Sequence, residues 1–114
     1  MAVNIYDTAN EMEEELRQTT EYTNLVAAYA EMKKDPKAYD LFKDFQEVQV
    51  SLQQKQMNGE DLTDDEMKHA REIASEVGNV DVIKTLMDKE RSLNQLLNDI
   101  NQIITKPIQE LYQD

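Results

Sequence analysis

Apolar residues recur along this chain at intervals of three and four positions, which is the period of an amphipathic helix rather than of a strand. The first such stretch follows Asn4, a residue type that caps helix N-termini well, and Asp7 lies where the helix dipole favours negative charge. The sequence therefore predicts a first helix from residue 5, and its apolar face consists of Ile5, Ala9, Met12 and Leu16.

Two further helices are predicted before residue 60, and each has its own start signal. Thr19 and Thr20 offer a cap for a helix that ends near the lysine pair at 33–34, because basic residues suit a helix C-terminus. Asp35 and Pro36 then restart the chain, since Asp caps a helix and Pro fits its first position, where no hydrogen bond is lost. The apolar face of the third helix comprises Leu41, Phe42, Phe45, Val48 and Leu52.

The segment Leu52–Met67, LQQKQMNGEDLTDDEM, contains one helix exit and one helix entry. Gly59 supplies the left-handed residue on which helices commonly stop. Thr63, followed three residues later by Glu66, is a capping box that begins a fourth helix. Gly78 with Asn79 is predicted to end that helix through the same left-handed conformation. The buried candidates of the fourth helix are Met67, Ala70, Ile73, Ala74 and Val77.

From Asp81 onward the apolar residues keep the alternating spacing of three and four that is typical of a coiled coil, interrupted only by Glu90. We expect Glu90 at the edge of this stripe, where its carboxylate reaches water. Pro107 removes a helical hydrogen bond, so it either kinks this helix or begins a short C-terminal one. The sequence thus predicts an all-α fold: a small bundle of four or five helices in a single domain, 1–114, whose long C-terminal helix is kinked or broken near Pro107.

Composition narrows the classes of function. The 114 residues include 39% hydrophobic and 32% charged residues, two glycines, two prolines and no cysteine, and the formal net charge is -12. That charge opposes direct binding to nucleic acid or to anionic membranes, although four lysines between 33 and 43 form a local basic group. No stretch is apolar for the roughly 20 residues that a bilayer span requires, so we expect a cytoplasmic protein. The two isolated glycines cannot build a phosphate-binding loop, and we expect no cofactor.

Candidate chemistry is sparse. Asp61, Asp64, Asp65 and Glu66 have the oxygen ligands for a weakly bound divalent metal ion, but helix capping and solvation explain the same residues better. His69 is the only histidine and has no nucleophile or acid in a catalytic spacing, so we expect neither an enzyme nor a metal site. The tyrosines at 6, 22, 29 and 39 are expected in the core, with a groove or subunit boundary as the alternative.

Three segments resemble a known family: MAVNIYDTANEMEEELR, LFKDFQEVQVSLQQKQMNGEDLTDDE and LNDINQIITKPIQELY. Together they are similar to the YheA branch of the YlbF/YmcA-like family of small helical proteins from Gram-positive bacteria. The resemblance implies a cytoplasmic all-α homo-oligomer without assigned enzymatic activity. Some relatives are regulatory accessory subunits of an RNA-processing endoribonuclease, and some hold iron-sulfur clusters through cysteines, which this chain lacks.

The leading expectation is a non-enzymatic, self-associating interaction module, most simply a dimer, because a small domain lacks core and the C-terminal stripe is wide. An accessory factor in RNA processing, contacting a protein partner rather than RNA, is the alternative, and a weak divalent-metal-binding protein is the third. The expected self-association residues are Ile83, Leu86, Leu93, Leu96, Leu97, Ile100, Ile103 and Ile104. The expected partner surface consists of Gln53, Gln54, Gln56, Glu60 and Asp61.

Overall fold

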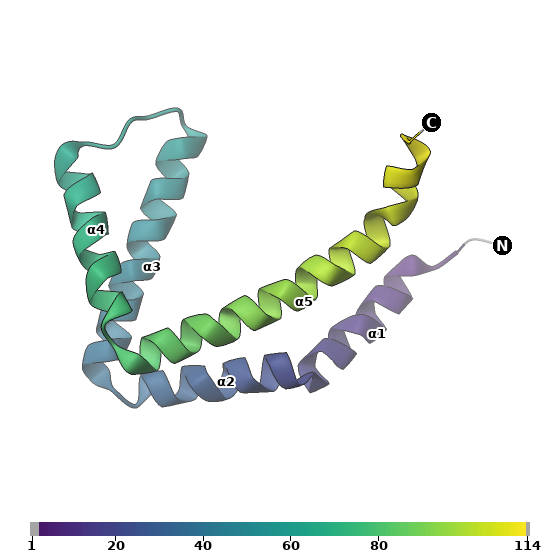
Figure 1. Ribbon diagram of the computed structural model, residues 1–114, viewed down its shortest axis with the longest axis horizontal. Coiled ribbons are helices and arrows are strands. Elements are labelled where there is room, and N and C mark those ends of the chain that lie inside the picture. The colour runs from purple at the N-terminus through teal and green to yellow at the C-terminus, as the bar shows by residue number, and fades with distance from the viewer. Residues whose placement is uncertain (1–2, 114) are drawn as a thin grey trace. The chain divides into compact units, whose positions relative to one another are not determined.

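The computed structural model describes residues 3–113, and its regular secondary structure is entirely helical over that range, which confirms the predicted all-α class (Figure 1). The five helices are α1 Ile5–Gln18, α2 Thr20–Lys33, α3 Pro36–Met57, α4 Asp64–Gly78 and α5 Asp81–Leu111.

The predicted start signals are confirmed at atomic level. The side chain of Asn4 accepts a hydrogen bond from the backbone N–H of Asp7 at the start of α1. Asp35 accepts from two backbone N–H groups at the start of α3, where Pro36 occupies the first turn. At α4, Thr63 accepts from the backbone N–H of Glu66, whose carboxylate accepts from the N–H of Thr63 in return. Each cap satisfies backbone donors that the first helical turn leaves without partners.

The two glycines behave differently from each other. Gly59 has a φ of 69°, the left-handed conformation that the sequence predicts after α3. Gly78 does not have a positive φ, so the predicted left-handed conformation is wrong, although α4 does end at Gly78 with Asn79 as its C-cap. The N–H of Asn79 bonds the carbonyl groups of Glu76 and Val77, and the chain enters α5 two residues after Asn79. A right-handed turn suffices here because the chain starts a new helix at once.

The chain divides into two compact units. The hairpin unit is Ala28–Met87, and the terminal unit holds the described residues of Met1–Ala27 and Asp88–Asp114. Helices α2 and α5 each contribute to both units. A single cooperative domain over 1–114 stays a prediction.

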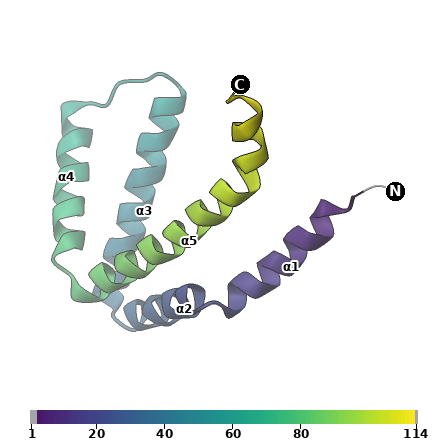
Figure 2. The ribbon, with the colours of Figure 1, turned by 45° about the vertical axis from the view of Figure 1, so that its right-hand side comes forward.

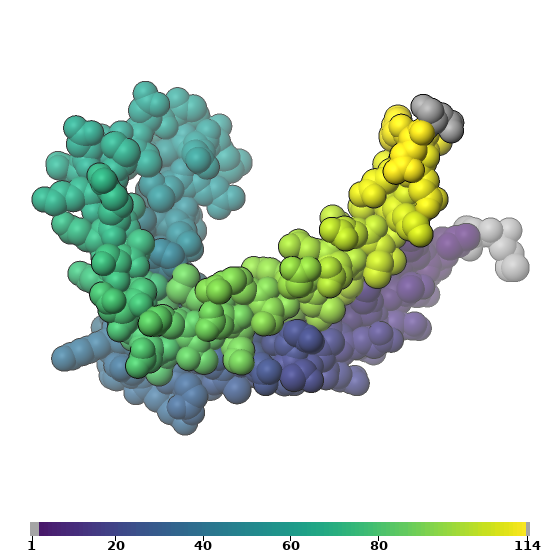
Figure 3. Space-filling view, in the orientation of Figure 1, coloured from purple at the N-terminus to yellow at the C-terminus, as the bar shows by residue number. Residues whose placement is uncertain are grey.

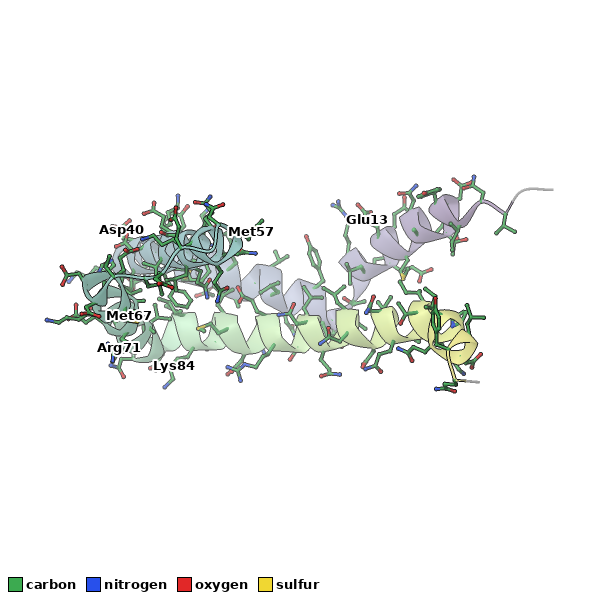
Figure 4. All side chains as sticks on the ribbon, turned by 90° about the horizontal axis from the view of Figure 1, so that it is seen from above. Glu13, Asp40, Met57, Met67, Arg71 and Lys84 are labelled. Carbon is green, nitrogen blue, oxygen red and sulfur yellow. The ribbon has the colours of Figure 1, made fainter. Side chains whose placement is uncertain are left out.

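The hairpin unit contains the core. α3 and α4 lie side by side and antiparallel, joined by the 58–63 loop (Figures 1 and 2). Of the described residues, the buried ones all belong to this unit: Ala28, Met32, Ala38, Phe42, Ile73, Val77, Ile83 and Leu86. In α4 only Ile73 and Val77, one turn apart, reach the core. The expectation of a longer buried face is wrong, because Met67, in the first turn beside the loop, and Ala74 are both exposed (Figure 4).

The terminal unit has no fully buried side chain among its described residues. Within it, α5 continues through Pro107 without a break in helical assignment, and its ribbon bends in the last turns (Figure 1). Of the two alternatives for Pro107, the kinked continuation therefore describes the chain better than a separate short helix. Glu90 is only half-buried, as expected for the edge of the apolar stripe.

Candidate interaction surfaces

The expected self-association residues on α5 fall into two groups. Ile83 and Leu86 are 0% and 1% exposed inside the hairpin unit, so they belong to the core of the chain and are unavailable to a second copy. Sequence reasoning placed them in the interface because a heptad pattern marks an apolar face without saying which residues cover it. The other six lie in the terminal unit and keep solvent exposure: Leu93, Leu96 and Ile100 are half-buried, and Leu97, Ile103 and Ile104 are exposed.

Two residues beyond Pro107 extend this apolar face. Ile108 is 59% exposed and Leu111 is 67% exposed, and they continue the spacing of Ile100 and Ile104 along the same helix. The sequence predicts Ile108 and Leu111 on a helix after Pro107, and because α5 continues through the proline these residues join the stripe. The α5 stripe is therefore defined as Leu97, Ile100, Ile103, Ile104, Ile108 and Leu111. In the space-filling view the C-terminal turns of α5 are the yellow atoms (Figure 3).

The expected partner surface is exposed but not gathered into one site. Gln53, Gln54 and Gln56 lie in the last turns of α3, whereas Glu60 and Asp61 lie in the following loop. Of these five residues, only Gln54 lines the shallow hollow along α3 that is formed by Lys43, Gln46, Glu47, Val50, Ser51 and Gln54.

In the acidic segment after Gly59, Glu66 has a structural role. The Glu66 carboxylate bonds both Lys55 of α3 and the N–H of Thr63, and these bonds, the Lys55 bond first, hold the pKa of Glu66 below its usual range. Within residues 3–113, no three His, Asp or Glu side chains come together in a way that would hold a metal ion. His69 is exposed on α4. Helix capping therefore explains the presence of Thr63 and Glu66 at these positions.

The tyrosines lie outside the core, which contradicts the first expectation for them. Tyr6 is 79% exposed, Tyr29 is 39% exposed, and Tyr22 and Tyr39 are half-buried. Their phenol groups explain this outcome, since a hydroxyl group loses hydration on burial unless it finds a partner.

Tyr29 and Tyr39 meet two lysines at the junction of α2 and α3. The Lys33 ammonium lies 5.6 Å from the ring centre of Tyr29 and 5.8 Å from that of Tyr39, and the Lys43 ammonium lies 4.7 Å from the Tyr39 ring. These are cation–π distances. The Lys43 ammonium lowers the pKa of the Tyr39 phenol, first through a hydrogen bond, and the same bond raises the pKa of Lys43. Sequence reasoning noted the lysines but missed this Tyr–Lys cluster, defined as Tyr29, Lys33, Tyr39 and Lys43.

None of the helices described between residues 3 and 113 has both the length and the apolar composition needed to cross a membrane.

Relatives match the chain along its whole length. A protein from Lactiplantibacillus plantarum called UPF0342 protein is 67% identical over 114 residues, and the match covers 100% of both chains. A UPF0342 protein from Pediococcus pentosaceus is 61% identical with the same complete coverage.

Two solved structures share the fold. The structure titled yheA from Bacillus subtilis has a TM-score of 0.76 and 31% identity, covering 96% of this chain and 100% of that one. A protein of unknown function (DUF964) from Bacillus stearothermophilus has a TM-score of 0.84 and 25% identity, covering 96% of both chains. The family model described as "Control of competence regulator ComK, YlbF/YmcA" matches residues 5–109. The chain therefore belongs to the YlbF/YmcA family.

Proposed function

We propose that this protein is a non-enzymatic interaction module that forms a dimer with a second copy of itself through the α5 stripe. The observation that carries the proposal is the exposure of neighbouring large apolar side chains on one helix. Ile103 is 70% exposed, Ile104 59%, and the stripe continues past Pro107 to Leu111. Contiguous exposed apolar surface of this kind marks interaction sites in soluble proteins.

The energetics require the stripe to act as a whole. Complete burial of one leucine or isoleucine side chain is worth about 1.5–3 kcal/mol, whereas association costs about 4–15 kcal/mol of lost translational and rotational freedom. One or two residues could not offset that cost. Six residues on one face, facing the same six of a second copy, supply enough apolar area, and a two-fold axis provides this arrangement without further residues.

Multi-angle light scattering at micromolar concentration tests the proposal, and a dimer is the expected result. Ile104→Glu introduces a charge into the stripe and should shift the protein to the monomer. Gln102→Glu is the matched control, because it adds the same charge to an exposed residue about 200° away around the helix. A monomeric wild type, or equal masses for both variants and the wild type, would overturn the proposal.

A non-enzymatic role in the cytoplasm is supported by the chemistry of the surface. The single histidine is exposed, the Glu66 carboxylate is bound to a lysine, and the chain lacks cysteine, which is compatible with a reducing compartment.

A second candidate, a regulatory accessory protein, is favoured by the family match over residues 5–109, whose description names control of a competence regulator. Contact with an RNA-processing complex is the specific form of this candidate. Affinity purification of the tagged protein from its native cells tests it, with RNA-processing enzymes as the expected co-purifying proteins. Their absence from the eluate of a tagged, functional chain would count against this candidate.

A further inference from the structure

The Tyr–Lys cluster concentrates positive charge on a chain whose net charge is -12. Two ammonium groups, from Lys33 at the end of α2 and Lys43 in α3, lie within 6 Å of the centre of one ring, that of Tyr39. Among the described residues, neither lysine has a carboxylate within ion-pair distance. The hydrogen bond with Tyr39 is the main cause of the raised pKa of Lys43, and the Asp40 carboxylate contributes less. The cluster therefore has unused capacity for an anion.

The donors in the cluster define the kind of anion that fits. Each ammonium group has three hydrogen-bond donors, and the phenol groups of Tyr29 and Tyr39 supply two more. Hydrogen bonds from such groups to a carboxylate are charge-assisted and stronger than neutral ones. Two carboxylates on one partner segment would neutralise the two ammonium groups.

The cluster also continues into a longer surface. Lys43 is the first residue of the shallow hollow that runs along α3 to Gln54. This hollow follows one face of α3 for about three turns. It contains one exposed apolar side chain, Val50, which is 52% exposed, among amide and hydroxyl groups, and Glu47 is its one acidic residue. A surface of this length and mixed polarity suits a helix that is laid along it.

Helix α1 has the complementary chemistry. It carries five acidic residues and one basic residue, Arg17, and none of its side chains is buried. Its apolar face is only partly covered, since Ile5 and Ala9 are exposed, whereas Met12 and Leu16 are half-buried. Glu13 is already paired with Arg17 at 3.0 Å. Glu11 and Glu15 are one turn apart, lie on the same side of the apolar face and have no ion-pair partner among the described residues.

We infer that the Tyr–Lys cluster and the adjoining face of α3 form the docking site for α1 of a second copy of this chain. In this contact Glu11 and Glu15 face Lys33 and Lys43, and the exposed apolar side chain of Ile5 covers Val50. A two-fold dimer would contain the contact twice, once in each direction. The inference rests on the proposed self-association and names a second surface that takes part in it.

A charge-swap experiment with the full-length chain tests the docking site. One variant carries Lys33→Glu and Lys43→Glu, and the other carries Glu11→Lys and Glu15→Lys; all four side chains are exposed, so both variants should fold. We expect each variant alone to self-associate roughly tenfold more weakly than the wild type, and an equimolar mixture of the two to recover association. Sedimentation equilibrium measures the dissociation constants, and circular dichroism confirms the helical content.

The matched control is Lys68→Glu with Lys84→Glu, which changes the net charge equally at two other exposed lysines. If cluster reversal weakens association no more than this control, or if the mixture stays as weak as its components, the docking site is wrong. If the wild type associates and the cluster variants associate equally well, this inference alone is wrong. A wild type that stays monomeric overturns the proposed function as well.

Discussion

Lys55 of α3 and Glu66 of α4 form an ion pair across the hairpin, and the same Glu66 carboxylate closes the capping box of α4 with Thr63. One side chain therefore joins two helices and fixes the start of the second. Both residues are partly shielded from solvent, with side-chain exposures of 26% for Lys55 and 33% for Glu66. The other ion pairs between described residues connect positions three or four apart within a helix or at its end, where they add little to tertiary structure.

The Lys55–Glu66 pair predicts a pH-dependent contribution to stability. The pKa of Glu66 is lowered from its ordinary value of 4.5, so the pair stabilises the folded state above that pH and loses its contribution as pH falls through the lowered pKa. Lys55→Met should therefore destabilise the protein at pH 7. The stability difference from the wild type should shrink as the pH falls below 4.5.

Urea unfolding of the wild type and the Lys55→Met variant between pH 7 and pH 3 measures this difference. Lys68→Met serves as the control, because Lys68 is an exposed lysine of α4 outside the observed ion pairs. A gap between Lys55→Met and the wild type that stays constant over this pH range would contradict the linkage.

Replacing the two glycines by alanine should have opposite effects. Gly59 has a φ of 69°, and although nothing lies within 4 Å of an added Cβ, alanine in this left-handed conformation is strained. Gly59→Ala should cost about 1–2 kcal/mol of unfolding free energy. Gly78 is helical and also has open space around it, so Gly78→Ala should stabilise by about 0.4–1 kcal/mol. Chemical denaturation measures the change in unfolding free energy for each variant. If both variants are stabilised, or both are destabilised, the assigned glycine conformations are wrong.

Local signals explain why so much of the fold could be predicted. Helix caps act over three residues, so Asn4, Asp35 and Thr63 could be identified from sequence alone, and the structure confirms each. Gly78 was misjudged because an adjacent helix start, rather than a left-handed residue, ends α4. Sequence specifies local hydrogen bonding well because both partners are neighbours along the chain.

The candidate surfaces could not be predicted fully, because they depend on contacts between residues that are far apart in the sequence. Ile83 and Ile104 belong to one continuous apolar pattern, yet the first is fully buried and the second is 59% exposed. Periodicity marks both as apolar and says nothing about which neighbour covers them. The Tyr–Lys cluster was missed for a similar reason, because Lys33 and Tyr39 belong to different helices and meet only after the chain turns at Asp35.

The same substitution, methionine to alanine, should have different effects on stability at a core position and at a surface position. Met32 is 0% exposed in the hairpin unit, so Met32→Ala leaves a cavity and should cost about 2–5 kcal/mol. Met57, at the end of α3, is 80% exposed, and Met57→Ala should change the unfolding free energy by less than about 0.5 kcal/mol (Figure 4). Urea denaturation at one fixed protein concentration measures both, because self-association would otherwise add to the apparent stability. Equal costs at the two positions would contradict the placement of the core.

Hydrogen exchange should distinguish the two units and report on self-association. The buried side chains of the described chain belong to the hairpin unit, so the amides in the middle of α3 and α4 should exchange slowly at any protein concentration. Helix α1 has no buried side chain, and its amides should exchange quickly in dilute solution. If a second copy covers α1, the exchange of α1 must slow as the concentration rises through the dissociation constant, while α4, which lies outside the contact, changes little. Exchange in α1 that stays equally fast in monomer and dimer would mean that α1 takes no part in the contact, and association would then rest on the α5 stripe alone.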